Sequence, residues 1–416
     1  MVDVRPFRGV HYDPAVVGDL TATTAPAFDD IDRFAYAHRR TASPYTVLEL
    51  LAAHPDRGYA PARDVLRRWW RTGVLTRDRT PAIYRYEEHE LREGAPAVQR
   101  GLCVCMAVTG FTPDGPVLPH EETDTERLEE RAARLDAVPL DVSPVFALYR
   151  QGPSVVREVL DAVPTEPPIV AITDEDGTDH RVWRVDAPEQ VHELRDALRH
   201  VQVVIADGHH RYATALARAR KHAPDAASPV GHTLAYLVDA DVHGPRVLAV
   251  HRLLRRAPHD LLARVEADFT IHQVPDDPEQ LARTISGSTE RRWGLHLATP
   301  GGPGTFLLRP RDDAALIPRA PAGHSSRWRQ LDTAVLHHAV LANLPADTVD
   351  VETRSDTAAA IAEVDAGRAA ALFLLRPTTS AEVLHLARQG EPMPAKTTSF
   401  RPKPRTGLIM RSAAAP

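Results

Sequence analysis

One stretch of the chain constrains the fold more than any other, because it has the pattern of a buried strand followed directly by a glycine turn and a helix. Residues 201–206 (VQVVIA) are almost entirely apolar and rich in β-branched side chains, which is typical of a buried strand. Gly208 permits a tight turn that a Cβ would block, and the alanine-rich residues 212–222 predict a helix. This unit predicts a mixed α/β (α+β) fold with a ligand site at the carboxyl end of the strand.

Polar side chains surround that turn at Gly208. Asp207 ends the expected strand, and His209, His210 and Arg211 open the expected helix. The free N–H groups at a helix start attract an anion, but the helix dipole alone contributes only about 0.3–1 kcal/mol. A phosphate site therefore needs cations as well, which Arg211 and the two histidines can supply. Asp207 is a candidate to hold Mg²⁺ or to accept a proton; in the simplest alternative it only caps the helix.

A second polar block, Pro-His-Glu-Glu-Thr at 119–123, lies at the start of a helix expected over 121–138. Glu121 or Glu122 is a candidate general base, with His120 as its neighbour or as an acid. The alternative is structural, because acidic residues and a capping Thr123 are what the first turn of any helix favours. The His-Glu-x-x-His spacing of metalloproteases does not occur.

A third block, KTTSFRPKPRTGL at 396–408, holds two of only three lysines in a chain with 47 arginines. Lys396 and Lys403 offer compact charges suited to phosphate, and Thr397 and Thr398 offer hydroxyl groups. Two prolines keep the segment extended. We interpret the block as a loop that closes over a ligand; the alternative is an exposed basic tail.

Composition narrows the class of protein. Hydrophobic residues make up 43% of the 416 residues, which is enough for sizeable cores, and the net charge of −6 argues against nucleic-acid binding. No apolar run approaches the ~20 residues of a membrane span, and the amino-terminal segment lacks the apolar region of a signal peptide. Cys103 and Cys105 are too close in sequence to staple the fold. We therefore expect a reducing compartment, a cytoplasmic location and no membrane partner.

Four regions are expected along the chain. Residues 1–115 form an amino-terminal α/β region, residues 116–256 a core with the two histidine-containing blocks, residues 257–310 a small α/β insert, and residues 311–416 a helical region that ends in the lysine block. Helices are predicted over 44–54, 62–72 and 331–344, among others, and a polar tail from 392. The sequence contains no Walker A motif, Rossmann glycine fingerprint or Gly-x-Ser-x-Gly elbow, which argues against a P-loop kinase or an α/β-hydrolase.

Taken together, these blocks resemble, nearly from end to end, the family catalogued as domain of unknown function 1015 (DUF1015). The matching segments are RPFRGVHYDP near the start, SPYTVLEL at 43–50, PHEET at 119–123, SPVFALY at 143–149, VIADGHHRYATAL at 204–216, LDTAVLHHAVL at 331–341 and MPAKTTSFRPKPRTGL at 393–408. A further matching segment is APAFDDI at 25–31, where the family usually reads Ala-Pro-Pro-Tyr-Asp and this chain has Ala27 and Phe28 in place of the second proline and the tyrosine.

The Asp-Gly-His-His-Arg block also resembles the nucleotide-handling motif of the ParB/sulfiredoxin-like fold, a group that includes free-serine kinases. The resemblance implies a ParB/sulfiredoxin-like core, with residues 207–211 around nucleotide phosphates and a carboxylate elsewhere as the base.

These patterns and resemblances lead us to expect a nucleotide-dependent phosphotransferase. Its partners would be ATP or ADP with Mg²⁺ and a small hydroxyl-bearing metabolite such as serine. Arg211, Lys396 and Lys403 would be the cations, Asp207 would hold the metal, and Glu121 or Glu122 would be the base.

Two alternatives are open. One is a phosphatase or metal-dependent hydrolase of a phosphorylated small molecule that uses His120, Asp207, His209 and His210. The other is a non-catalytic nucleotide-binding regulator. The sequence also leaves the oligomeric state open, a homo-oligomer included.

Overall fold

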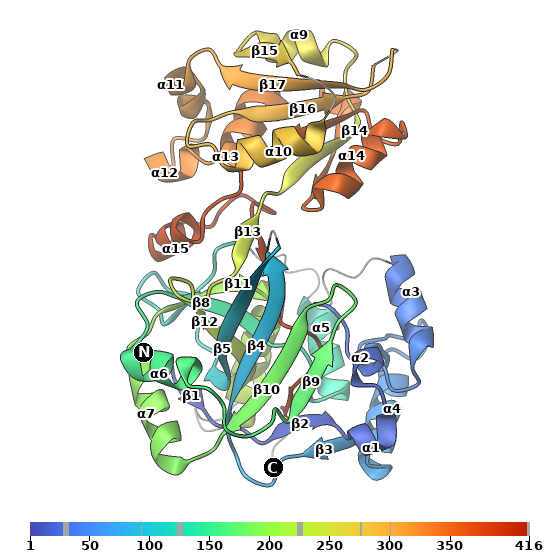
Figure 1. The fold of residues 1–416 in the computed structure, drawn as a ribbon, viewed down its shortest axis with the longest axis vertical. Coiled ribbons are helices and arrows are strands. Elements are labelled where there is room, and N and C mark those ends of the chain that lie inside the picture. The colour runs from blue at the N-terminus through green and yellow to red at the C-terminus, as the bar shows by residue number, and fades with distance from the viewer. Residues whose placement is uncertain are drawn as a thin grey trace. The chain divides into compact units, whose positions relative to one another are not determined.

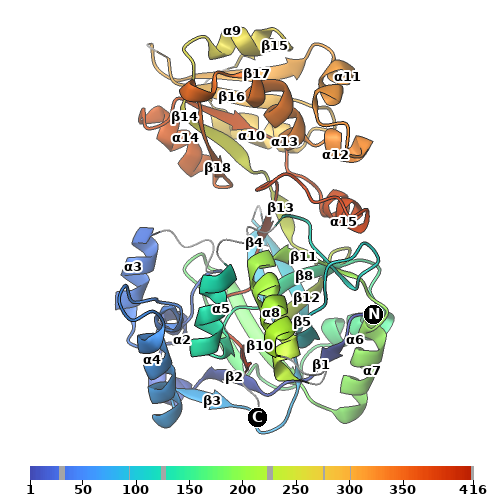
Figure 2. The same cartoon turned by 180° about the vertical axis from the view of Figure 1, so that it is seen from behind.

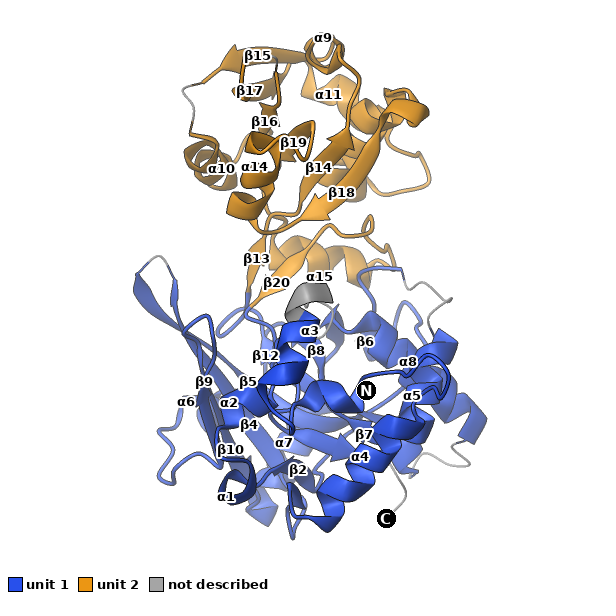
Figure 3. Cartoon of the chain, turned by 90° about the vertical axis from the view of Figure 1, so that its right-hand side faces the viewer, with its two compact units in different colours: residues 1–245, 402–416 blue, residues 246–401 orange. Residues whose placement is uncertain are grey.

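The computed structural model describes residues 1–27, 33–92, 94–122, 128–222, 228–274, 277–299 and 301–413. The chain forms two compact units (Figure 3): unit 1 comprises Met1–Pro245 and Pro402–Pro416, and unit 2 comprises Arg246–Arg401. Residues 257–310, expected as an insert, lie within unit 2, and residues 311–416 are divided between the two units. The finer division into four regions stays a prediction.

Unit 1 is built around a sheet of nine described strands (Figure 1). Their bounds are Val4–Arg5 (β1), Ile83–Arg92 (β4), Ala95–Ala107 (β5), Val117–Leu118 (β6), Val145–Tyr149 (β8), Val170–Thr173 (β9), Asp179–Val185 (β10), Val203–Asp207 (β11) and His232–Asp239 (β12). The order is β6-β11-β8-β12-β5-β4-β10-β9, with β1 on β5. Strands β6 and β11 pair in parallel, as do β8 and β12, and the remaining pairs are antiparallel. The expected mixed α/β class is therefore confirmed.

Helices bury one apolar face against this sheet. They are α6 (Ser154–Asp161), α7 (Pro188–Leu198) and α8 (His209–His222), while α5 (Leu128–Ala137) has one buried residue, Leu135. Tyr212 of α8 and Leu194 of α7 belong to the same buried cluster as Val104, Ala147 and Ile205 of the sheet. Helix α5 packs beside α8 (Figure 2). The predicted strand at 201–206 and the helix after it are thus central to unit 1.

A smaller four-stranded sheet completes unit 1, in the order β3-β2-β21-β7. Its strands are β2 (Gly9–Tyr12), β3 (Leu75–Arg77), β7 (Leu140–Asp141) and β21 (Met410–Ser412). Around it lie α1 (Pro14–Val17), α2 (Leu20–Thr23), α3 (Arg33–Ala42), the single 3₁₀ turn Val47–Leu50 and α4 (Ala60–Arg71). Met410 and Trp69 are buried in one cluster here. The end of the chain, expected as a polar tail, therefore contributes a buried strand.

Unit 2 contains an antiparallel sheet in the order β15-β17-β16-β19-β14-β18. Its strands are His251–Arg256 (β14), Phe269–Gln273 (β15), Trp293–Leu297 (β16), Gly304–Pro310 (β17), Asp350–Arg354 (β18) and Ala371–Leu374 (β19). A separate pair joins β13 (Arg246–Leu248) to β20 (Ser399–Arg401). The helices are α9 (Leu261–Glu266), α10 (Pro278–Ser286), α11 (Asp313–Leu316), α12 (Ser326–Arg329), α13 (Asp332–Val335), α14 (Thr357–Asp365) and α15 (Ser380–Arg388).

Helix boundaries differ from expectation in two places, and a third expectation falls partly outside the described residues. The helix predicted over 331–344 is regular only in α13 and continues as the wider π turn Leu336–Val340. The helix predicted over 44–54 is a single 3₁₀ turn. Helix α5 is described from Leu128, and the expected cap Thr123 lies outside the described residues. In the described chain, no helix combines the length and apolarity needed to cross a membrane.

Candidate functional site

The loop between β11 and α8 carries much of the predicted site. Strand β11 ends at Asp207, and Gly208 has a φ of 93°, a conformation that residues with a Cβ rarely adopt. A Cβ on Gly208 would also lie 2.9 Å from both Cζ and Nε of Arg211. Glycine is therefore required for two reasons: it turns the chain, and it lets the Arg211 guanidinium fold back over the loop.

Asp207 lies between two cations, one from α8 and one from the end of the chain. Its Oδ1 is 2.9 Å from Nζ of Lys403, and its Oδ2 pairs with Nη2 of Arg211. Only 14% of the Asp207 side chain and 12% of the Lys403 side chain are exposed. Burial raises the pKa of the Asp207 carboxyl, but the charges of Lys403 and Arg211 outweigh burial and hold that pKa well below its usual value. Asp207 is therefore an ionised carboxylate that fixes both cations at the end of β11.

The Arg211 guanidinium is held in one orientation. Its Nη1 donates to Oγ of Ser143 at 2.6 Å and to the carbonyl oxygen of Pro144, while Nη2 donates to Asp207. A guanidinium stays charged at any physiological pH. These contacts thus place a permanent positive charge beside the first turn of α8.

Two buried histidines, His120 and His209, lie next to this loop with their ring centroids 4.6 Å apart. The backbone N–H of His120 donates to Nε2 of His209 at 3.3 Å, and Nδ1 of His120 lies 2.5 Å from the carbonyl oxygen of Ile205, to which it donates. Burial, and after it the neighbouring His120, lowers the pKa of His209 to about 3. His209 is therefore a neutral ring at pH 7, and the sequence-based expectation that it supplies a cation is wrong.

Of the two candidate bases, Glu121 is the one beside the histidines. Its Oε1 lies 3.6 Å from Nε2 of His120, and 20% of its side chain is exposed. Glu122 is exposed. Since Nδ1 of His120 donates to a carbonyl, its Nε2 is the ring atom that faces the carboxylate. The geometry favours Glu121 over Glu122.

Lys403 reaches Asp207 because its segment is anchored to the large sheet on both sides. Nε2 of Gln99 donates to the carbonyl oxygen of Pro402 at 3.3 Å. The backbone N–H of Arg405 donates to Oη of Tyr86 at 3.2 Å. Gln99 and Tyr86 lie on the paired strands β5 and β4, so the central hairpin of the sheet fixes the path of the chain through Lys403.

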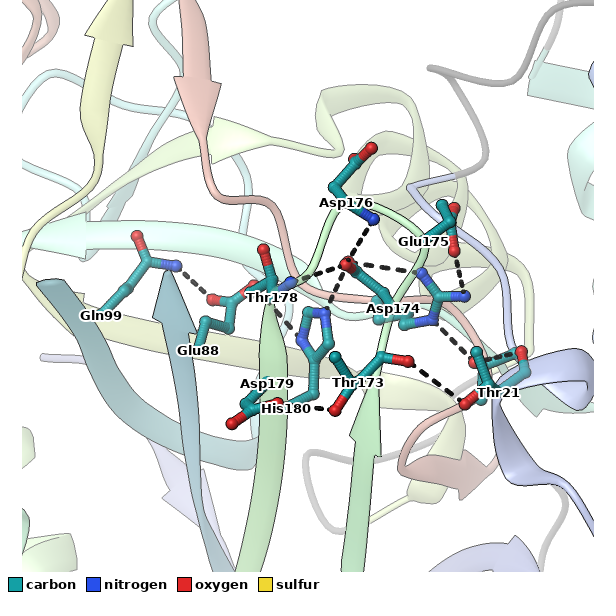
Figure 4. A network of polar contacts seen from close by, with 12 residues as sticks. Thr21, Glu88, Gln99, Thr173, Asp174, Glu175, Asp176, Thr178, Asp179 and His180 are labelled. Atoms are coloured by element: carbon teal, nitrogen blue, oxygen red, sulfur yellow. Dashed lines mark hydrogen bonds and ion pairs between the residues drawn. The ribbon is translucent and has the colours of Figure 1, made fainter. Parts of the chain in front are cut away.

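The Arg405 side chain, which is 2% exposed, contacts the acids of the turn between β9 and β10. Figure 4 shows the polar network at this turn, with Asp174, Glu175 and His180 labelled. Nη2 of Arg405 pairs with Glu175 at 3.0 Å, and its Nη1 lies 3.6 Å from Oδ2 of Asp174. Oδ2 of Asp174 also lies 2.9 Å from Nε2 of His180, whose Nδ1 is 2.7 Å from Oη of Tyr86. Tyr86 also accepts a hydrogen bond from the backbone N–H of Arg405, so the contacts form a ring that begins and ends at Arg405.

Glu88 is the most buried acid of this network, with no exposed surface on β4. It accepts a hydrogen bond from Nε2 of Gln99, and its Oε1 lies 3.9 Å from Nδ1 of His180 (Figure 4). Burial raises the pKa of Glu88 to about 8. A neutral carboxylic acid therefore supports the side chain that binds Pro402.

The sequence did not single out these anchoring residues. In β4, Tyr84, Tyr86 and Glu88 recur at every second position and so point to the same face. The spacing of Glu88 is the sequence signal that could have identified it, because this acid faces the same side of a buried strand as Tyr84 and Tyr86.

The remaining predicted residues are Lys396, Thr397, Thr398 and His210. Lys396, Thr397 and Thr398 belong to unit 2, and Lys403 belongs to unit 1. Thr397 is buried and donates to the carbonyl oxygen of Pro394 at 2.5 Å, while Lys396 is exposed. His210 is half-buried in the first turn of α8. A phosphate-binding role for these four residues stays a prediction.

The groups around Asp207 do not fit a magnesium ion. Mg²⁺ needs oxygen ligands that are free to face it, and both oxygens of Asp207 already face cations. Across the described ranges, no group of three or more His, Cys, Asp or Glu side chains could hold a metal ion. We therefore correct the expected role of Asp207: it positions Lys403 and Arg211, and we derive no step through a metal.

Comparison with known proteins gives one family and several remote structures. Among curated proteins, none matches. Similar solved structures include a free serine kinase in complex with AMP (14% identity, 71% of this chain and 87% of that chain, TM-score 0.34) and a variant of a free serine kinase in complex with ADP (14%, 71% and 90%, 0.34). A conserved hypothetical protein from Pyrococcus furiosus is similar at 15% identity over 71% of this chain and 92% of that chain, with a TM-score of 0.33. Likenesses this remote carry no argument about activity. The model of the family described as protein of unknown function (DUF1015) matches residues 4–334, and the chain belongs to this family.

Proposed function

We propose that unit 1 binds a nucleotide by its phosphates at the Asp207 loop and transfers a phosphoryl group to a hydroxyl of a small metabolite. The observation that carries the proposal is the pairing of Lys403 and Arg211 on one half-buried carboxylate at the end of β11. Two cations held in fixed positions are what phosphoryl transfer needs, because its transition state spreads negative charge over several oxygens.

The surroundings of the pair support an anion site. Helix α8 has 14 residues, and its first turn offers backbone N–H groups without intrahelical partners. Gly208 leaves room for the Arg211 guanidinium beside this turn. His209 is neutral and accepts at Nε2, so its proton is on Nδ1, where it serves as a hydrogen-bond donor.

Glu121 is our candidate for the base. In the proposed step the acceptor oxygen forms a bond to phosphorus, the bond from phosphorus to the leaving nucleotide oxygen breaks, and the acceptor proton passes to the Glu121 carboxylate. The imidazole of His120 lies beside that carboxylate, with Nε2 3.6 Å from Oε1. Glu122, which is exposed, is the matched residue that takes no part.

The experiment compares lysines. Purified chain is titrated with ADP and with ATP by calorimetry, and ³¹P NMR follows a panel of hydroxyl-bearing metabolites that includes serine. Lys403→Met should weaken nucleotide binding at least tenfold, because one of two phosphate contacts is lost. Lys221→Met, an exposed lysine in the last turn of α8, is the control and should bind as the parent does.

Three outcomes are informative. Nucleotide consumption with a phosphorylated product, lost in Glu121→Gln and kept in Glu122→Gln, supports the transfer step. Nucleotide binding without any product would replace transfer by the non-catalytic regulator. No binding of ADP or ATP at millimolar concentration would overturn the proposal.

A further inference from the structure

A cavity of about 270 Å³ in unit 1 lies beside Arg211, and the proposed phosphoryl transfer makes no use of it. Helix α5, Thr214 of α8 and residues of the segments 51–59 and 141–143 line it. The apolar part of the wall is formed by Leu51, Leu135 and Val142. The cationic part is formed by Arg131, Arg134 and Arg211. At ~30 Å³ for each water, the volume corresponds to about nine waters, so a ligand of amino-acid size fits.

Arg134 is the residue that points to a ligand. Its Nη1 is buried and has no hydrogen-bond partner among the residues the structure describes. Burial lowers the pKa of its guanidinium, against the opposing effect of Asp141. A buried donor on a charged group costs free energy unless a partner satisfies it. An anion in the cavity would supply that partner.

The acids that line the cavity are already engaged. Asp141 accepts from Nε of Arg411 at 2.8 Å and from the backbone N–H of Leu234 at 3.1 Å. Glu130 accepts from Oη of Tyr59 at 3.2 Å. Neither forms an ion pair with Arg134 in the described part of unit 1, so the lining itself does not neutralise that guanidinium.

The charge of the lining selects the kind of anion. Among the described residues that line the cavity, Arg134 is the guanidinium whose buried Nη1 has no hydrogen-bond partner, and a single guanidinium matches one negative charge. A carboxylate carries one negative charge, whereas a phosphate monoester carries about 1.5 to 2 at pH 7. The apolar side of the cavity favours a ligand with a hydrocarbon body.

We propose that this cavity binds a small organic monocarboxylate, with its carboxylate on Arg134 and its apolar body against Leu51, Leu135 and Val142. The site is separate from the phosphate site at Asp207, although Arg211 borders both. The proposal does not depend on the proposed phosphoryl transfer.

The experiment titrates the full chain by calorimetry with hexanoate, with hexanamide and with inorganic phosphate. Hexanoate should bind with a dissociation constant of millimolar or lower, and hexanamide at least tenfold more weakly, because it keeps the body and lacks the charge. Inorganic phosphate, which lacks the apolar body, should not compete with hexanoate.

Arg134→Met should reduce hexanoate binding at least tenfold without lowering the melting temperature, since it removes a buried unpaired donor and keeps a side chain of similar volume. Arg68→Met, at an exposed position of α4, should bind hexanoate as the parent does.

A second variant tests whether the loss of hexanoate binding in Arg134→Met comes from the cavity itself. Ala53→Phe fills the cavity from its exposed rim and should also abolish hexanoate binding while ADP binding is kept. Hexanoate binding that survives both Arg134→Met and Ala53→Phe would overturn the proposal. The same holds if hexanoate fails to bind, or if phosphate competes with it.

Discussion

Two aspartates, one in each unit, have the same kind of partners and very different surroundings. Asp207 of unit 1 lies between Lys403 and Arg211. In unit 2, Asp332 accepts from Nη1 of Arg291 at 2.7 Å and from Nε and Nη2 of Arg376 at 2.8 and 2.7 Å. Each carboxylate therefore joins cations that are far apart in the sequence.

The arginines at both aspartates also donate to other protein acceptors, so the difference lies in the elements that flank each aspartate. In unit 2, Nη2 of Arg291 donates to the carbonyl oxygen of Gln330 at 2.9 Å, and Nη1 of Arg376 donates to that of Thr289 at 3.1 Å. Asp332 opens a helix of only four residues. Asp207 instead precedes a glycine of positive φ and a helix of 14 residues beside a neutral imidazole. An aspartate between cations is thus not by itself a ligand site. The glycine, the long helix and the neutral imidazole beside Asp207 are what distinguish it from Asp332.

The same substitution in both aspartates tests this comparison and should give the largest effects. Asp332→Asn should lower the free energy of unfolding by about 3–5 kcal/mol, because it leaves charged groups at a buried position without their counter-charge. Asp207→Asn should cost less, about 1–3 kcal/mol, because Lys403 can turn its ammonium to water on a flexible stem. Urea unfolding followed by tryptophan fluorescence measures both.

The two variants should differ in the opposite sense in their ADP affinity: the variant that is less destabilised should lose more affinity. Asp207→Asn should weaken ADP binding at least tenfold, because Lys403 and Arg211 lose the group that positions them. Asp332→Asn should leave that affinity unchanged, as should the exposed control Asp350→Asn. Equal losses of ADP affinity in both aspartate variants would contradict the distinction drawn between the two units.

The sequence predicted the strand–turn–helix unit at Asp207 because every part of it is local: a β-branched run, a glycine and an alanine-rich helix. The mixed α/β class followed from the same pattern. The role of Lys403, as distinct from Lys396, could not be predicted, because the path of that segment depends on hydrogen bonds to Gln99 and Tyr86 from distant strands. The neutral state of His209 was equally hidden, since it follows from burial that only the folded chain creates.

Glu88 extends the comparison to a buried acid of unit 1 that no cation neutralises in the described contacts. Its pKa of about 8 exceeds the ordinary glutamate value of 4.5, so between these two pH values the folded chain keeps a proton that the unfolded chain releases. Stability should therefore fall as pH rises from 5 to 9. At about 1.4 kcal/mol per pKa unit, the loss over this range is on the order of 4 kcal/mol.

Glu88→Gln removes the titrating group and keeps a hydrogen-bonding partner for Gln99. Urea unfolding at pH 5, 7 and 9 should show a flatter stability profile for this variant than for the parent, and ADP affinity at pH 9 should fall less. The exposed Glu193→Gln on α7 is the control. A parent stability that rises between pH 7 and 9, or an unchanged slope in Glu88→Gln, would rule out a protonated Glu88.

Substitution of Ser143 should have the smallest effect on ADP binding, and it tests how the Arg211 guanidinium is held beside Asp207. Its Oγ accepts from Nη1 of Arg211 at 2.6 Å, but the same nitrogen also donates to Pro144, and Nη2 keeps its bond to Asp207. Ser143→Ala should therefore cost roughly 1 kcal/mol in ADP binding, a loss of about fivefold, because the guanidinium loses one of three acceptors and gains freedom to rotate. Calorimetry with ADP measures it, and Ser154→Ala, at an exposed position of α6, is the control. A loss as large as that of Asp207→Asn would mean that Ser143 contacts the ligand itself, whereas no loss would mean that Asp207 alone positions Arg211.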